Sequence, residues 1–144
     1  MNVQKLTQKS IEAIQGAQNL AMDRRNSQVE QEHLMLALLQ QEGGLIGSLM
    51  EKMGVQVRPF EQALEANIRK LPQLSQAGQL YASADLENAL NEAEKQAAAM
   101  QDEYTSVEHL MLGILEKPSA GMKQLLTSYQ VNEKIFREVL KQTR

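Results

Sequence analysis

Hydrophobic residues recur along this chain three or four positions apart, which is the spacing of amphipathic helices. A first periodic stretch follows Thr7 and carries Ile11, Ile14 and Ala21 on one face, and a second follows Ser83. A hydroxyl can accept a hydrogen bond from a free N–H group of the first helical turn, so both residues are predicted N-caps. No stretch shows the sustained alternation of a half-buried strand, so strands are not expected. The apolar face of the second stretch consists of Leu86, Leu90, Ala93 and Ala97.

Two short segments, 34–39 and 110–115, are apolar on every side apart from Gly113. A helix that is hydrophobic all round is buried, so we expect these two helices to form the centre of the molecule. Thr105 and Glu108 have the spacing of a capping box, which predicts that the second of these helices begins there.

Two further helices are expected after each central segment. Gly54 is placed to end one of them in a left-handed conformation, and Asn132 is placed to cap the last one. Pro59 falls in a first helical turn, where its missing N–H costs little. The predicted inward-facing residues are Leu45, Leu49, Met50 and Met53, then Phe60, Leu64 and Ile68, then Met122, Leu125, Leu126 and Tyr129, and finally Phe136, Val139 and Leu140.

The chain also repeats itself once. The block from Glu32 to Leu39 returns from Glu108 to Leu115, a shift of 76 residues that also superimposes the two predicted caps. Solenoid and propeller repeats have periods of roughly 20–50 residues, so this longer period indicates a duplicated four-helix unit. We therefore predict an all-α fold with eight helices, arranged as two pseudo-symmetric four-helix repeats packed into one globular domain over residues 1–144. Repeat one is expected over about 7–70, a linker over 71–82 and repeat two over about 83–144.

The composition narrows the function classes. The chain has 144 residues, 42% of them apolar, and no cysteine, so it has neither disulfides nor a thiol nucleophile. The first residues lack the apolar stretch of a signal peptide, and no apolar run approaches the roughly 18–20 residues of a membrane span. A net charge of −3 with interspersed signs argues against nucleic acid as the ligand. We expect a cytoplasmic protein that binds neither nucleic acid nor membrane.

No constellation of catalytic or metal-binding residues stands out. Zinc takes three or four ligands, yet His33 and His109 have no second ligand in register and are interpreted as structural residues of a first helical turn. The glycine-rich run from Gly43 to Gly47 follows a helix and lacks the Lys-Ser/Thr of a phosphate loop. The carboxylates spread over helix faces rather than converge. We predict no catalytic residue, no metal and no cofactor in this chain.

Methionine is unusually frequent beside few aromatic residues. The chain has 8 Met but only 3 Tyr and 2 Phe. Methionine fills irregular cores, and it also suits surfaces that accept varied apolar partners. We expect most of these side chains in the core and a minority along an exposed groove.

Three features together resemble the Clp N-terminal domain, the double Clp repeat at the head of Clp-family AAA+ chaperones. They are the doubled Glu-His-Leu-Met-Leu block, the hydroxyl-capped first helices and the linker from Leu71 to Ser75. The linker start Lys70-Leu71-Pro72 and the turn Gln41-Glu42-Gly43-Gly44 are more similar to ClpB, a disaggregase, than to ClpC or ClpA. The resemblance covers essentially the whole chain.

The resemblance implies a non-catalytic, substrate-engaging domain tethered to ATPase modules that thread aggregated polypeptide through a hexameric ring. ATP and magnesium would belong to those modules, because this chain has no Walker A sequence. The implied partners are unfolded or aggregated proteins and the remainder of the hexameric chaperone, while the isolated domain is expected to be monomeric.

The resemblance also implies a binding site. In ClpB-type domains, residues matching Thr7, Asp102 and Glu108 are associated with substrate handling, beside an apolar groove between the repeats. His109 departs from the pattern, because some relatives carry an apolar residue at this place. We expect the apolar seam around Thr7, Ile14, Leu90 and Leu110. The predicted substrate-binding residues are thus Thr7, Ile14, Leu90, Asp102, Glu108 and Leu110.

The function that follows is the binding of exposed hydrophobic segments of misfolded or aggregated proteins. The alternative is an adaptor-docking domain of a ClpC- or ClpA-like, protease-associated unfoldase, which would bind one specific folded partner. Promiscuous, weak binding favours the first interpretation, and a specific, mutation-sensitive interface favours the second.

Overall fold

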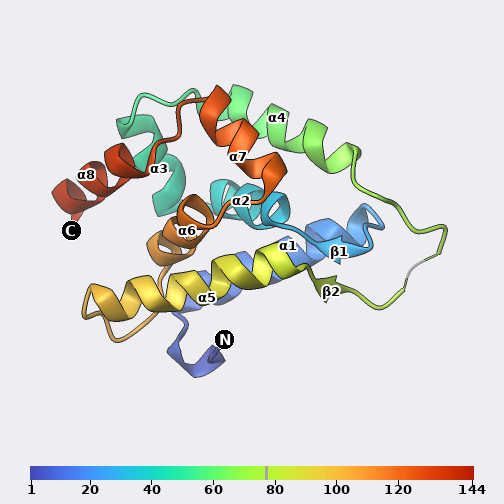
Figure 1. Ribbon diagram of the computed structural model, residues 1–144, viewed down its shortest axis with the longest axis horizontal. Helices are drawn as coiled ribbons and strands as arrows, with labels where there is room; N and C mark the ends of the chain where they lie inside the picture. The colour runs from blue at the N-terminus through green and yellow to red at the C-terminus, as the bar shows by residue number, and fades with distance from the viewer. Residues whose placement is uncertain (77) are drawn as a thin grey trace.

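The computed structural model describes residues 1–76 and 78–144, and this part of the chain is mostly helical (Figure 1). It contains eight α-helices, four in each half, which confirms the predicted all-α class. A 3₁₀ turn, Val3–Lys5, precedes them. The first half comprises α1 (Gln8–Asp23), α2 (Gln31–Gln40), α3 (Leu45–Lys52) and α4 (Val57–Arg69), and the second comprises α5 (Ala84–Ala99), α6 (Val107–Glu116), α7 (Ala120–Ser128) and α8 (Glu133–Thr143).

The helix starts agree with the predicted caps. Thr7 Oγ1 accepts a hydrogen bond from the Ser10 N–H at 3.2 Å, and Ser83 Oγ accepts one from the Leu86 N–H at 3.0 Å. Asn132 Oδ1 accepts from two N–H groups in the first turn of α8. These bonds satisfy donors that a helix leaves free at its N-terminus.

The helix ends repeat as well. Arg25 follows α1 with φ 54°, and Gln101, its counterpart 76 residues later, follows α5 with φ 60°. Gly54 is left-handed as predicted, at φ 83°, and its counterpart Gln130 takes φ 59°. The same backbone terminator therefore closes α1 and α5, and another closes α3 and α7.

Each half begins by pairing with the other half. Leu6, just before α1, forms a parallel bridge with Thr105, just before α6. The equivalent pairing joins β2 (Tyr81–Ala82), before α5, to β1 (Gln28–Val29), before α2. These two strands were not expected, because two residues are too few to leave an alternating pattern in the sequence. These two reciprocal pairings tie the first helix of each half to the second helix of the other half.

Helices α2 and α6 form the central layer, with α1 and α5 on one side and α3, α4, α7 and α8 on the other (Figure 1). Every residue in 31–38 and in 107–114 is buried, which confirms the prediction for the two central segments. Helix α1 packs on α2 and α5 packs on α6. Because α3 also contacts α6 and α4 contacts α7, the buried residues of both halves form one apolar core.

The face that α1 turns towards the core differs from the predicted one. Ile11 and Ile14 are only partly buried. Helix α1 lies so close to α2 that a Cβ added to Gly16 would be 3.3 Å from the Cβ of Ala37, which leaves room only for small residues in the contact. The larger isoleucines stand beside the contact, where Ile14 can line a surface. The buried residues of α1 are Ser10, Ala13, Ala17 and Ala21.

The segment 71–82, the predicted linker, is attached to the end of α1. The Leu74 N–H donates to the Arg25 carbonyl oxygen at 2.7 Å, and Asn26 Nδ2 donates to the Pro72 carbonyl oxygen at 3.3 Å. Ala77 lies outside the described residues. The segment ends in β2, so its last residues are part of the paired backbone.

Gly113 tests the close packing of α6 on α5. A Cβ at this position would overlap the carbonyl oxygen of Ala89. We expect Gly113→Ala to lower the free energy of unfolding by about 1–3 kcal/mol, the usual cost of overpacking, as measured by denaturant unfolding.

Gly47→Ala is the matched control for this substitution. Gly47 lies inside α3, and nothing stands within 4 Å of the added Cβ. The same change should raise stability there by roughly 0.5–1 kcal/mol through helix propensity. Equal effects of the two variants would contradict the tight α5–α6 contact.

Candidate functional site

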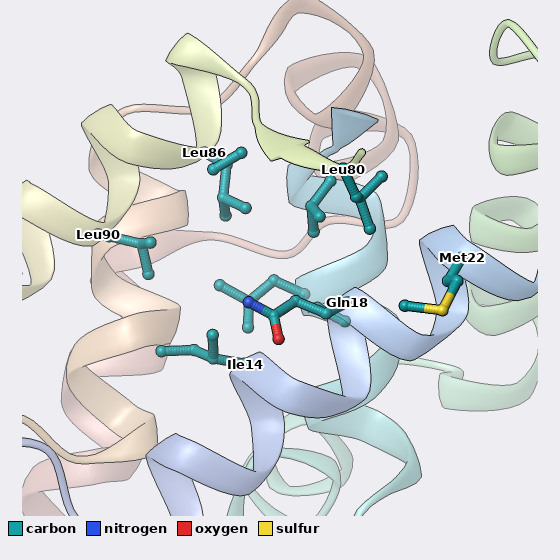
Figure 2. Close-up of a pocket in the computed structure, with 10 residues that line it drawn as sticks. Ile14, Gln18, Met22, Leu80, Leu86 and Leu90 are labelled. Carbon is teal, nitrogen blue, oxygen red and sulfur yellow. The ribbon is translucent and has the colours of Figure 1, made fainter. Parts of the chain in front are cut away.

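An apolar cleft opens between α1 and α5 (Figure 2). Its volume is about 350 Å³, and nine of its ten lining residues are apolar, Gln18 being the polar one. Such a lining can shield the apolar groups of a bound molecule from water, and these ten side chains supply no acid or base. The lining residues are Ile14, Ala17, Gln18 and Met22 of α1, Val29 of β1, Leu34 of α2, Leu80 and Ala82 at β2, and Leu86 and Leu90 of α5.

Helical spacing places the side chains that line the cleft. Ile14, Gln18 and Met22 are four residues apart on α1 and therefore share one face, as do Leu86 and Leu90 on α5 (Figure 2). This face flanks the alanine contact with the central layer. Because the alanines occupy the helix–helix contact, the longer side chains remain at its edge and form the walls of the cleft.

The duplication does not give the cleft two equal sides. Ile14 and Leu90 are repeat counterparts, 76 residues apart. Beyond them, Ser10 stands where the second half has Leu86, and Thr105 stands where the first half has Val29. Ser10 Oγ donates to the Thr105 carbonyl oxygen at 2.9 Å, and both residues are buried. Hydrogen-bonded polar groups thus occupy positions equivalent to two apolar walls of the cleft.

The structure separates the six residues predicted to bind substrate. Ile14 and Leu90 line the cleft. Thr7 and Glu108 line a second depression of about 310 Å³, beside the turn between α2 and α3. Leu110 is 0% exposed and belongs to the core. Thr7, Glu108 and Leu110 therefore do not border the cleft, contrary to the seam expected from the sequence, and a part for these residues in substrate binding stays a prediction.

Asp102, the sixth predicted residue, belongs to a charged cluster near the end of α8. Its Oδ2 accepts hydrogen bonds from Arg144 Nη2 at 2.6 Å and from His109 Nε2 at 2.8 Å. Arg144 Nε also lies 3.6 Å from Glu108 Oε2. The hydrogen bond from Arg144 holds the pKa of Asp102 below its usual range, so this carboxylate is ionised at neutral pH. Arg144 thus links two of the predicted residues away from the cleft.

Comparison with known proteins places this architecture in a family. Residues 5–129 match the family described as the Clp repeat (R) N-terminal domain. The chain belongs to this family. It is similar to the chaperone protein ClpB of Bacillus cereus, with 34% identity over 137 residues that cover 92% of this chain and 16% of that protein. The chain therefore spans about 16% of the length of that ClpB relative.

Solved structures of Clp-type N-domains share the fold. The Hsp104 N-terminal domain from Candida albicans aligns with a TM-score of 0.83 and 20% identity, covering 94% of this chain and 88% of that one. A ClpV N-domain in complex with a VipB peptide aligns with a TM-score of 0.70 and 19% identity, covering 88% of this chain and 79% of that one. At these identities the likeness concerns the fold alone.

The sequence pattern did not predict every residue that lines the cleft of this Clp domain. Leu80 and Ala82 lie in the segment assigned to the linker, and their alternate spacing before Ser83 was the available signal. Met22 lies outside the apolar face of α1, and it confirms that a minority of the methionines line a groove. Four other methionines, Met35, Met50, Met111 and Met122, are fully buried, which confirms the prediction that most methionines lie in the core.

The two histidines of the Clp repeats are structural, as predicted. Nδ1 of His33 accepts a hydrogen bond from the Glu30 N–H at 2.9 Å, and Nδ1 of His109 accepts one from the Ser106 N–H at 2.8 Å. The predicted Thr105–Glu108 capping box is therefore wrong by one residue, since Ser106 and His109 form it. Thr105, one residue before this cap, forms a parallel β-bridge with Leu6 instead.

The capping bonds fix the tautomer of each imidazole. Because Nδ1 accepts, the proton resides on Nε2, which donates to Asn26 Oδ1 from His33 and to Asp102 Oδ2 from His109, both at 2.8 Å. Both ring nitrogens are engaged in each case, so neither imidazole has a lone pair free for a metal ion.

His33 makes stability depend on pH. Burial, aided by the charge of Arg24, lowers the pKa of His33 to about 4, against about 6.5 in an unfolded chain. Below pH 6.5 the unfolded state binds more protons than the folded state, so the stability present above this pH is lost as the pH falls towards 4. Between pH 7.5 and pH 5 we expect His33 to remove about 2 kcal/mol, measured by urea unfolding.

His33→Gln is the matched variant. Glutamine at this position can still accept the Glu30 N–H but does not titrate. The carboxylates titrate in both proteins, so the variant should lose about 2 kcal/mol less than the wild type over the same range. Parallel pH profiles would show that His33 is not held neutral by the fold.

Proposed function

We propose that this Clp domain is a non-catalytic module that engages exposed hydrophobic segments of misfolded or aggregated proteins, as part of a ClpB-like ATP-dependent disaggregase. The observation that carries the proposal is the apolar cleft between α1 and α5. Membership of the Clp N-terminal family and the similarity to ClpB support it.

The chemistry of the cleft suits promiscuous recognition of apolar side chains. Its walls are aliphatic or thioether groups, so affinity comes from water release rather than from a charge or a directed hydrogen bond. A volume of about 350 Å³ is at the small end of ligand sites and accommodates a few side chains rather than a folded surface. The peptide bound to the ClpV N-domain supports a peptide as the occupant of this fold.

The remaining partners follow from the same proposal. ATP and magnesium would act in the ATPase modules of a full-length, hexameric AAA+ chaperone, and this chain would need no cofactor of its own. We place that chaperone in the cytoplasm. Within the described residues, no helix combines the length and apolar character needed to cross a bilayer.

The proposed binding is weak. Burying about 300 Å² of apolar surface, summed over the cleft and the bound segment, would gain roughly 7–8 kcal/mol. Association costs at least about 4 kcal/mol, and an unfolded peptide pays more. The net gain is at most about 3–4 kcal/mol, so we expect a dissociation constant of about 1 mM or weaker for a single segment.

A cleft variant and a matched control test the site. Leu90 and Leu39 are both partly buried against the core, but only Leu90 belongs to the lining residues of the cleft. Leu90→Ala should weaken binding of a permanently unfolded polypeptide, such as reduced and carboxymethylated lactalbumin, by about threefold or more. Leu39→Ala should destabilise the fold without this loss. Chemical-shift titration measures binding, and denaturant unfolding measures stability.

The same titration distinguishes this proposal from the adaptor-docking alternative. Shifts that gather around Ile14, Leu86 and Leu90 and tolerate different unfolded sequences support the proposal. Tight binding to one folded protein, with no response to unfolded chains, would instead establish a docking domain. Equal losses of binding in the two leucine variants would show that the cleft is not the site.

A further inference from the structure

Met22 is set apart from the buried methionines of the core. It is 60% exposed and lines the cleft, whereas Met35 and Met111 are 0% exposed. Figure 2 places its thioether at the end of the cleft that also holds Leu80, with Gln18 one turn earlier on the same helix. The cleft thus carries a sulfur atom that solvent can reach.

The fold itself does not require a methionine at this position. The repeat counterpart of Met22 is Ala98, which is also exposed. A small side chain therefore serves equally well at this point of the helix. The thioether of Met22 adds apolar wall to the cleft rather than volume to the core.

We propose that Met22 is an oxidation site, and that conversion of its thioether to the sulfoxide by hydrogen peroxide weakens the binding of apolar segments in the cleft. This inference rests on the proposed function of the cleft. The sulfur lone pair attacks one peroxide oxygen, a new S–O bond forms and the O–O bond breaks. The second oxygen leaves as water after proton transfer, so sulfur loses two electrons and the peroxide gains them. A methionine sulfoxide reductase with a thiol reductant reverses the step.

Exposure favours the reaction at Met22, because Met53 and Met100 are only partly exposed. Peroxide must reach the sulfur, and the packed core shields Met35, Met50, Met111 and Met122. Met1, at 41% exposed, provides an internal comparison because nothing places it in the cleft.

The sulfoxide changes the character of the cleft wall. Its oxygen is a strong hydrogen-bond acceptor among the eight other apolar lining residues, and the amide of Gln18 is the polar neighbour on the same face. A bound aliphatic segment would have to strip water from that oxygen. We expect affinity for an unfolded polypeptide to fall by about three- to tenfold.

The test compares the full 144-residue chain with its Met22→Leu variant, each before and after limited treatment with hydrogen peroxide. Peptide mass mapping follows oxidation at each methionine, and titration with reduced, carboxymethylated lactalbumin measures affinity. The wild type should oxidise at Met22 well before the core methionines, lose affinity, and recover it after reductase treatment. The variant should oxidise at Met1 and keep the affinity it had before treatment.

Three results would overturn the inference: oxidation of Met22 no faster than that of Met35, full oxidation with unchanged affinity, or an equal loss in the variant. An untreated protein that ignores the unfolded polypeptide would instead refute the proposed function. The apolar dye 8-anilinonaphthalene-1-sulfonate then decides the inference. Peroxide should reduce its binding to the wild type but not to Met22→Leu, and equal responses would overturn the inference.

Discussion

The close approach of α1 to α2 and of α5 to α6 is the constraint on which the cleft depends. Gly16 faces the Cβ of Ala37 in one pair, and Gly113 faces the backbone of Ala89 in the other, so both helix pairs approach closely. Such contacts leave no room for long side chains between the helices. Leucine and isoleucine are displaced to the edges of the contact, where the facing edges of α1 and α5 form an apolar wall. The cleft is thus a consequence of how the core is packed.

The reciprocal backbone pairing between the two halves fixes their relative position. The Thr7 N–H donates to the Thr105 carbonyl oxygen, and the Ser83 N–H donates to the Val29 carbonyl oxygen. Each capping residue therefore belongs to its own helix and also pairs with the segment that precedes the second helix of the other half. A buried amide adds to this connection, since Gln31 donates to the carbonyl oxygens of Asp85 and Lys117. Walls contributed by different repeats consequently hold a defined separation.

Periodicity and capping predicted much of this architecture, because helices are specified by local residues. Eight helices, the buried central pair and the caps at Thr7, Ser83 and Asn132 follow from residues only a few positions apart. The cleft depends on contacts between distant segments, and the sequence located it only in part. Ile14 and Leu90 were found as apolar helix residues, whereas Leu80 was hidden in a segment without helical periodicity. The family resemblance directed attention to Asp102, whose bonding partners lie in α6 and at the end of α8.

The differences between the repeats distinguish the cleft from its pseudo-symmetric counterpart. The shared scaffold is conserved between the halves down to single hydrogen bonds, because both histidines accept from a capping N–H and donate to the residue seven positions earlier. Divergence appears where side chains leave that scaffold. Asn26 becomes Asp102 and recruits Arg144, while Ser10 and Thr105 replace the apolar pair Leu86 and Val29. A perfectly symmetric duplication would surround Ile14 and Leu90 with equivalent walls. The polar substitutions confine the apolar lining to the side of β2, so the cleft has a single orientation although the fold was built twice.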